Sequence, residues 1–320
     1  MESRLLEYML RVAELGSISK AAVDLQLSQP ALSRHIAVLE EEMRTKLFTR
    51  TQGGVIPTEA GKLLIARARP LLQQLSQLKE DLGDAAAGQL TIGVPPYWRT
   101  VLTTPFVQRL RAEHPGIQLR VHERLTQVIR AQMLEGVLDL CILPFEAEAP
   151  AGFTQTALVR EPLVLFGSAG DGLSPQEPVA ISRLDGASLI LPAQSDPLRA
   201  HLEHMLRRRD VGFRVVVETD SLGQSLQFAS RGIGLTVLPA CALTALGDYG
   251  VADSRIAWSP IRGLAMTWSL FESQARLHSR AVREGKRLVT ETLRASVDAG
   301  IWYGAEAMAS LSFTAWPEGA

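Results

Sequence analysis

Two short helical patterns separated by a two-residue turn constrain the fold more than any other feature of the first sixty residues. Ser19 can cap a helix of small residues, because a serine oxygen accepts a hydrogen bond from the first helical amides. After Gln26-Leu27, Ser28 can cap a second helix that carries Pro30 in its first turn, where a missing N–H costs nothing. The pattern predicts a helix-turn-helix at about residues 18–37.

The second of these helices presents polar side chains near its capped end. Its apolar residues share one stripe, which leaves Gln29, Ser33 and Arg34 on other faces. The N-terminal half of such a helix enters the major groove, where these residue types bond to bases or phosphates. A turn-rich stretch between short apolar segments predicts a hairpin, or wing, over residues 47–56. The predicted DNA contacts are Ser28, Gln29, Pro30, Ser33, Arg34 and Arg50.

Bulk charge gives this prediction no support. The net charge of the chain is -1, and its first 84 residues hold 11 basic and 11 acidic side chains. The acidic run Glu40-Glu41-Glu42 lies more than a turn beyond Arg34, so it can point away from DNA. The DNA-binding prediction therefore depends on where individual charges stand.

A connector of residues 61–88 is expected to follow a DNA-binding domain of residues 1–60. Leucine and alanine recur at helical spacing and predict a helix of more than twenty residues, kinked near Pro70, before a hinge at residues 83–88. A helix of this length has no core of its own to cover its apolar stripe, so we expect a partner chain to cover it. Packing on its own domain is the alternative.

From residue 89 onward, strand patterns alternate with helical ones, which is typical of an α/β domain with parallel strands. We expect a second domain over residues 89–297, made of two lobes that flank a cleft. Lobe I is assigned residues 89–162 and 267–297, and lobe II residues 163–266. Residues 298–320 form a tail of unassigned order.

Ligands of such sheets bind beyond the carboxyl ends of the strands, beside helix N-termini. Helix N-termini favour anions, so the expected effector is a small carboxylate. Tyr97 and Trp98 could stack on an aromatic effector, or they could narrow the cleft until little fits. The predicted effector contacts are Pro96, Tyr97, Trp98, Thr126, Ala193, Gln194, Ser195 and Ser221.

Several segments resemble the LysR-type transcriptional regulators in order and spacing. In the first domain these are residues 17–22, 27–34 and 58–61, and the resemblance extends over roughly residues 2–295. It implies a winged helix-turn-helix, a long linker helix and an effector domain akin to periplasmic solute-binding proteins. It also implies a homodimer or homotetramer that binds double-stranded promoter DNA and alters recruitment of RNA polymerase.

The chain departs from the family pattern at several positions. Gly53 stands where members often carry a basic residue, and Thr49 where a glutamate is common. In the second domain Tyr97 replaces a small hydroxyl residue, and Arg124 replaces a common glycine. The first pair predicts weaker contacts between the wing and DNA.

Other classes of function find little support. No nucleophile with a base, no carboxylate pair and no phosphate-binding glycine loop is evident, so we expect neither an enzyme nor a cofactor. Cys141 and Cys241 lack metal-site spacing, and His201 and His204 stand among arginines that would repel a metal, so no metal site is expected. No apolar run or signal segment points to a membrane, and we expect a cytoplasmic protein. The alternative kept open is a DNA-binding regulator whose cleft is closed and which acts without an effector.

Overall fold

The computed structural model describes residues 3–51, 53–82, 88–251, 255–274 and 280–308. The chain divides into two compact units. The first comprises residues 1–85 with residues 134–137, and the second comprises residues 86–133 and 138–320. No helix in the described ranges is long and apolar enough to cross a membrane.

The first unit is the predicted winged helix-turn-helix followed by a long helix. Its elements are α1 (Ser3–Leu15), α2 (Ile18–Asp24), α3 (Gln29–Met43), β1 (Phe48–Thr51), β2 (Gly54–Pro57) and α4 (Glu59–Leu82). Apolar residues of the three short helices, such as Met9, Val12, Leu32 and Leu39, are fully buried in one core. The two strands pair antiparallel and form the wing.

The start of α2 differs from the prediction. Ser17, and not Ser19, caps this helix, and its side chain accepts a hydrogen bond from the Lys20 amide at 3.3 Å. Gly16 ends α1 with a φ of +60°, in the left-handed region that glycine adopts without strain. The turn between the helices is therefore so short that the next residue already serves as the cap.

The predicted long connector helix is α4, which continues through position 70. One face packs on the core of the first unit through the buried Ala68, and Arg69 pairs with Glu14 of α1 at 2.9 Å. Leu63 and Leu71, in contrast, are more than half exposed. The helix thus packs partly on its own domain and also leaves apolar side chains uncovered, which leaves room for the expected partner chain.

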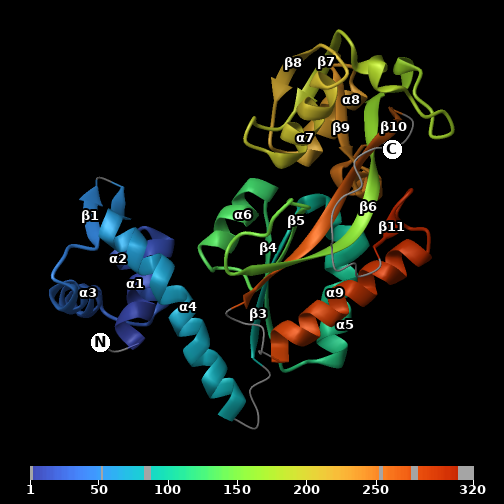
Figure 1. Ribbon diagram of the computed structural model, residues 1–320. Helices are drawn as coiled ribbons and strands as arrows, with labels where there is room; N and C mark the ends of the chain where they lie inside the picture. Colours follow the sequence, from blue (N-terminus) through green and yellow to red (C-terminus); the bar gives the residue numbers. More distant parts are fainter. Residues whose placement is uncertain (1–2, 52, 83–87, 252–254, 275–279, 309–320) are drawn as a thin grey trace. The chain divides into compact units, whose positions relative to one another are not determined.

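The second unit is built on one mixed sheet (Figure 1). Its strands are β3 (Gln89–Val94), β4 (Gln118–Glu123), β5 (Leu140–Pro144), β6 (Phe153–Ser168), β7 (Ala187–Leu191), β8 (Phe213–Glu218), β9 (Leu235–Pro239), β10 (Ile256–Ser273) and β11 (Glu306–Ala307). Their order is β4-β3-β5-β10-β6-β9-β7-β8, and β11 pairs with β6. Parallel strands lie towards both ends, and antiparallel long strands join them.

The long strands β6 and β10 run through both lobes side by side (Figure 1). In the sequence, a strand-like pattern covers only residues 163–166 of the first and 265–271 of the second. The remaining halves carry polar and proline residues, and the pairing is irregular between Pro260 and Ala265, so neither half shows a clean alternation.

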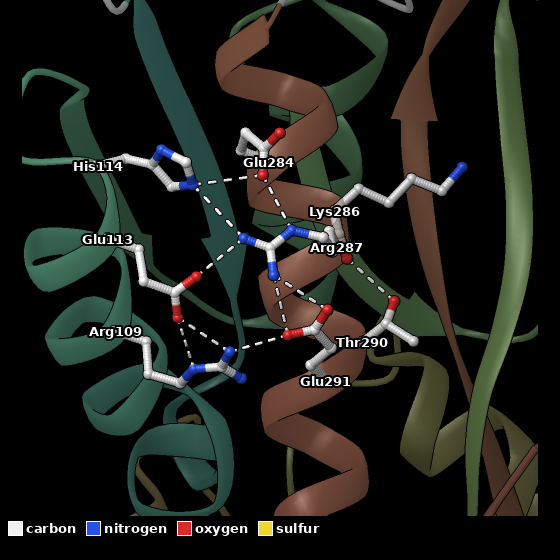
Figure 2. A network of polar contacts seen from close by, with 8 residues as sticks. All are labelled: Arg109, Glu113, His114, Glu284, Lys286, Arg287, Thr290 and Glu291. Carbon is white, nitrogen blue, oxygen red and sulfur yellow. Dashed lines mark hydrogen bonds and ion pairs between the residues drawn. The ribbon is translucent and has the colours of Figure 1, made fainter.

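In the described part of the second unit, the α-helices are α5 (Thr104–Glu113), α6 (Thr126–Leu134), α7 (Pro197–Arg207), α8 (Leu222–Ser230) and α9 (Arg280–Asp298). The sequence pattern of residues 99–113 favours one continuous helix, but Arg99–Thr103 form a π-helical turn before α5. Charged side chains join α5 to α9 (Figure 2), with Arg287 at 2.9 Å from Glu113 and Arg109 at 2.8 Å from Glu291. We refer to this group as the α5–α9 network.

The predicted tail begins with an ordered strap, residues 299–308, that contacts both lobes. Trp302 is buried and its ring centroid lies 4.9 Å from that of Trp98 in lobe I. The Tyr303 ring lies at the same distance from that of Trp258, next to lobe II. The strap therefore crosses the junction between the lobes. Residues 309–320 of the predicted tail lie outside the described residues.

Candidate functional site

The N-terminal turn of α3 is exposed and well capped. Ser28 accepts a hydrogen bond from the Ala31 amide at 3.3 Å, and Pro30 stands in the first turn, as predicted. Gln29 donates from Nε2 to the Ser33 hydroxyl at 3.1 Å, so these two side chains lie on one face. Arg34 is exposed. The structure thus brings five predicted DNA contacts together at one end of a helix.

The wing adds Arg50, which is exposed on β1 opposite Val55. Gly54 is required in the adjoining turn, because its φ is +137° and an added Cβ would lie 2.2 Å from the Gly16 carbonyl oxygen. Gly53 is different, since nothing lies within 4 Å of the position of a Cβ. A basic side chain would therefore fit at Gly53, where this chain has none.

One member of the acidic run has a structural task. Glu40 accepts hydrogen bonds from the Leu47 amide at 2.9 Å and from Lys46 Nζ at 2.6 Å. Burial opposes ionisation of Glu40, but the hydrogen bonds outweigh burial and lower its pKa below the ordinary value. The Glu40 carboxylate is therefore paired within the domain, with groups between α3 and β1.

The predicted cleft holds a cavity of only about 40 Å³, which is room for a few water molecules. Its walls come from both lobes, and lobe I is hydrogen bonded to lobe II by Thr126 Oγ1, which donates to Asp196 Oδ2 at 3.1 Å. Tyr97 is buried against Trp268, with ring centroids 5.6 Å apart. The cavity is lined by Pro96, Tyr97, Leu125, Thr126, Pro192, Asp196, Leu198, Thr219, Asp220, Ser221, Leu222, Ser225 and Leu238.

Half of the predicted effector contacts line this cavity, namely Pro96, Tyr97, Thr126 and Ser221. Trp98 lies behind the wall, fully buried. Ala193, Gln194 and Ser195 are outside the lining, and the latter two are exposed.

Two acidic residues of the cavity were missed. Asp196 caps α7 by accepting from the Leu198 amide at 2.8 Å, and Asp220 accepts from the Ala193 amide at 3.1 Å. Burial raises the pKa of Asp196, and the nearby charge of Asp220 raises it further. The Asp196-Pro197 pair was a readable cap signal, because proline often follows a cap residue.

A buried carboxylate, Glu161 of β6, lies among the residues that support the cleft. It accepts hydrogen bonds from the Cys241 amide and from Trp302 Nε1, both at 2.7 Å. Glu161 is fully buried, and burial raises its pKa from 4.5 to about 7. We call Glu161, Cys241 and Trp302 the Glu161 hub. The sequence offered no signal for it, because its members are 80 and 141 residues away from Glu161 along the chain.

Both parts of the chain match models of known protein families. Residues 3–62 match the family described as bacterial regulatory helix-turn-helix protein, lysR family, and residues 83–294 match the LysR substrate binding domain. The chain belongs to the LysR family. The family consists of transcriptional regulators, and the match covers both units of this LysR-type protein.

Individual relatives agree with this assignment. The nitrogen assimilation regulatory protein nac of Escherichia coli is 32% identical over 89% of this chain and 93% of its own length. The hydrogen peroxide-inducible genes activator of Dickeya chrysanthemi is 32% identical over 76% of this chain and 80% of its own length. The structure of a full-length OxyR point variant from Pseudomonas aeruginosa has a TM-score of 0.73 and 21% identity, covers 92% of this LysR-type chain and 95% of its own, and shares its fold.

Proposed function

We propose that this LysR-type regulator binds promoter DNA through Ser28, Gln29, Pro30, Ser33 and Arg34 of the α3 end and through Arg50 of the wing. The observation that carries the proposal is the exposed, capped N-terminus of α3, where Gln29 and Arg34 are exposed and Ser33 is hydrogen bonded to Gln29. A capped helix end favours phosphate, and an exposed arginine can bond to guanine.

Arg34→Ala tests the DNA contact. We expect affinity for promoter DNA to fall about 10- to 100-fold, as for loss of one base or phosphate contact. Gel shifts at one fixed salt concentration measure it, because salt alone changes such affinities. Arg4→Ala is the matched control, because Arg4 is also exposed but lies in α1, away from the capped end of α3. Equal binding by the Arg34→Ala and Arg4→Ala proteins would refute the role of Arg34.

The cleft is the proposed site of a small effector. The lining of the cavity disfavours the carboxylate effector that the sequence led us to expect. It contains Asp196 and Asp220 and, in the described part of the chain, no basic side chain. The N-terminus of α7 is already occupied by the Asp196 carboxylate, so the attraction of this helix end for an anion is largely spent. The lining therefore favours a small neutral or amine-bearing effector with hydrogen-bond donors.

A closed cleft that needs no effector is the second candidate function. It is favoured by the small volume of the cavity and by the bond between Thr126 and Asp196. Tyr97→Ala separates the two candidates, because removal of the phenol enlarges the cavity. If the cleft is closed, a library of small amines, alcohols and carboxylates raises the unfolding temperature of the Tyr97→Ala variant only. The effector site is supported if a compound raises the unfolding temperature of the unchanged protein but not that of the Thr126→Val variant.

A peroxide response is not part of the proposal, although some relatives are named for one. Thiolate is the reactive form of cysteine. Cys141 and Cys241 are both buried, and burial raises the pKa of both thiols above the ordinary value. Neither residue therefore has the exposure or the ionisation that reaction with peroxide requires.

Assembly and partners follow from the exposed face of α4. We propose a homodimer or homotetramer in which Leu63, Leu71 and Leu75 of two subunits cover one another, with RNA polymerase as a further partner at the promoter. Light scattering by the full chain and by a Leu63→Glu, Leu71→Glu variant tests the assembly. A variant with unchanged mass would refute this role for α4.

A further inference from the structure

A second and much larger cavity lies against α7, outside the cleft. Its volume is about 1000 Å³, against about 40 Å³ in the cleft. The walls are α7, the end of β5, Arg160 of β6 and residues 263–267 of β10. A cavity of this size falls in the range that binds small organic ligands.

One side of α7 faces this cavity along its whole length. Pro197, His201, His204 and Arg208 follow one another at three- and four-residue spacing, so they form one stripe. The leucines at 198, 202 and 206 point elsewhere and are buried in the core. Both histidines, together with Arg208 and Arg209, thus line a wall of the cavity.

The cavity is positively charged. Arg160, Arg208 and Arg209 line it, and no aspartate or glutamate does so within the described residues. His201 contributes no charge at neutral pH, since burial lowers its pKa, and its Nε2 donates to the Ala265 carbonyl at 3.1 Å. Arg160 forms an ion pair of 3.9 Å with Glu306, whose side chain is itself well exposed.

A structural role of the arginine run does not account for this charge. Arginines at the end of a helix can stabilise its C-terminus. Arg207 does so, because its Nε donates to the Glu203 carbonyl at 3.3 Å. In the described part of the chain, Arg208 and Arg209 make no side-chain hydrogen bond or ion pair, and both are exposed at the mouth of the cavity.

Apolar side chains form the remaining wall. Phe145 from the segment after β5, Met205 from α7 and Met266 from β10 all line the cavity. We propose that this cavity is a second ligand site, which binds an organic anion with an apolar body: the arginines bind the charged group and the methionine and phenylalanine surface covers the rest. The site is independent of which effector the cleft takes.

The position of the site gives it a way to influence the cleft. The first turn of α7 supplies Asp196 and Leu198 to the cleft, and Pro197 between them lines the larger cavity. A ligand against α7 therefore touches the same helix that Thr126 of lobe I holds through Asp196.

Calorimetric titration of the full chain with 1-naphthoate, an apolar anion, tests the proposal, with 1-naphthylmethylamine as the cation of the same size. We expect naphthoate to bind and the amine not to bind. The double variant Arg208→Glu, Arg209→Glu should weaken naphthoate binding about tenfold or more, since charge-assisted contacts are lost. Arg207→Glu is the control, because it makes the same arginine-to-glutamate charge reversal, at one position of the same run, without lining the cavity. It should change affinity less than twofold.

Four results would overturn the proposal. An equal loss in Arg207→Glu would mean that general charge attraction explains binding, and no loss in the double variant would place the anion elsewhere. Loss of naphthoate binding in Ser221→Ala would place it in the cleft. Binding by a chain cut after Met308, but not by the full chain, would mean that residues 309–320 and not a ligand are the occupant. Circular dichroism of each variant verifies folding.

Discussion

The α5–α9 network and the Glu161 hub are two polar clusters of the effector-binding domain with opposite designs. The network joins two arginines to three glutamates by ion pairs of 3.0 Å or less, and these side chains are about 30 to 40% exposed (Figure 2). The hub has a single carboxylate that is fully buried. Exposed ion pairs are worth little, whereas a buried polar group that loses its partner costs its full desolvation. The cluster with fewer contacts therefore carries more of the stability.

Trp302→Ala should have the largest effect. It removes a buried indole from against Trp98 and leaves Glu161 without one donor. We expect a loss of about 3–5 kcal/mol in the free energy of unfolding of the effector-binding domain, which is usual for deletion of a buried tryptophan. Urea unfolding followed by circular dichroism measures it. A loss below about 1 kcal/mol would break the contrast between the two clusters.

Glu161→Gln should remove a pH dependence. The pKa of Glu161 is raised in the folded state, so its contribution is fully present below pH 4.5 and is lost as pH rises to about 7. A shift of this size corresponds to about 3 kcal/mol. We therefore expect the variant to equal the unchanged protein near pH 4 and to exceed it in stability by up to about 3 kcal/mol at pH 8. Parallel stability curves for the two proteins from pH 4 to 8 would contradict this.

Arg287→Ala should have the smallest effect, although it removes contacts to three glutamates. The side chain is well hydrated, so we expect the unfolding temperature to fall by no more than about 2 °C at low salt and not at all in 0.5 M salt. Scanning calorimetry at both salt concentrations measures it. A fall that survives in high salt would show that the network stabilises the domain by packing.

Features that depend on neighbouring residues could be predicted from the sequence, and features that depend on residues far apart in the chain could not. Ser28 and Pro30 act within one helical turn, so the start of α3 could be read from a few residues. The wing and the alternating α/β elements also leave local patterns. Ser17 and Ser19 are both serines close to Gly16, so the sequence alone did not show which of them caps α2; in the structure it is Ser17.

The residues that line the cleft were harder to predict from the sequence, because they come from segments that lie far apart along the chain. The loop before α7 was predicted to reach the cleft through residues 193–195, but the residue that enters it is Asp196, which is both a cap and a bond to Thr126. The sequence does not predict the strap, because the burial of Trp302 depends on Trp98 and Glu161, which lie far away along the chain. Contacts of this kind leave no periodicity along the chain.

The clustering of the indole rings provides a built-in optical reporter. Tryptophan occurs at positions 98, 258, 268, 302 and 316, and at none in the DNA-binding domain. Three of these rings pack together at the junction of the lobes, with centroids 4.9 to 5.6 Å apart. Tryptophan fluorescence of the unlabelled protein therefore arises entirely outside the DNA-binding domain. A change in emission when a ligand is added signals movement at the lobe junction, even while the protein sits on DNA.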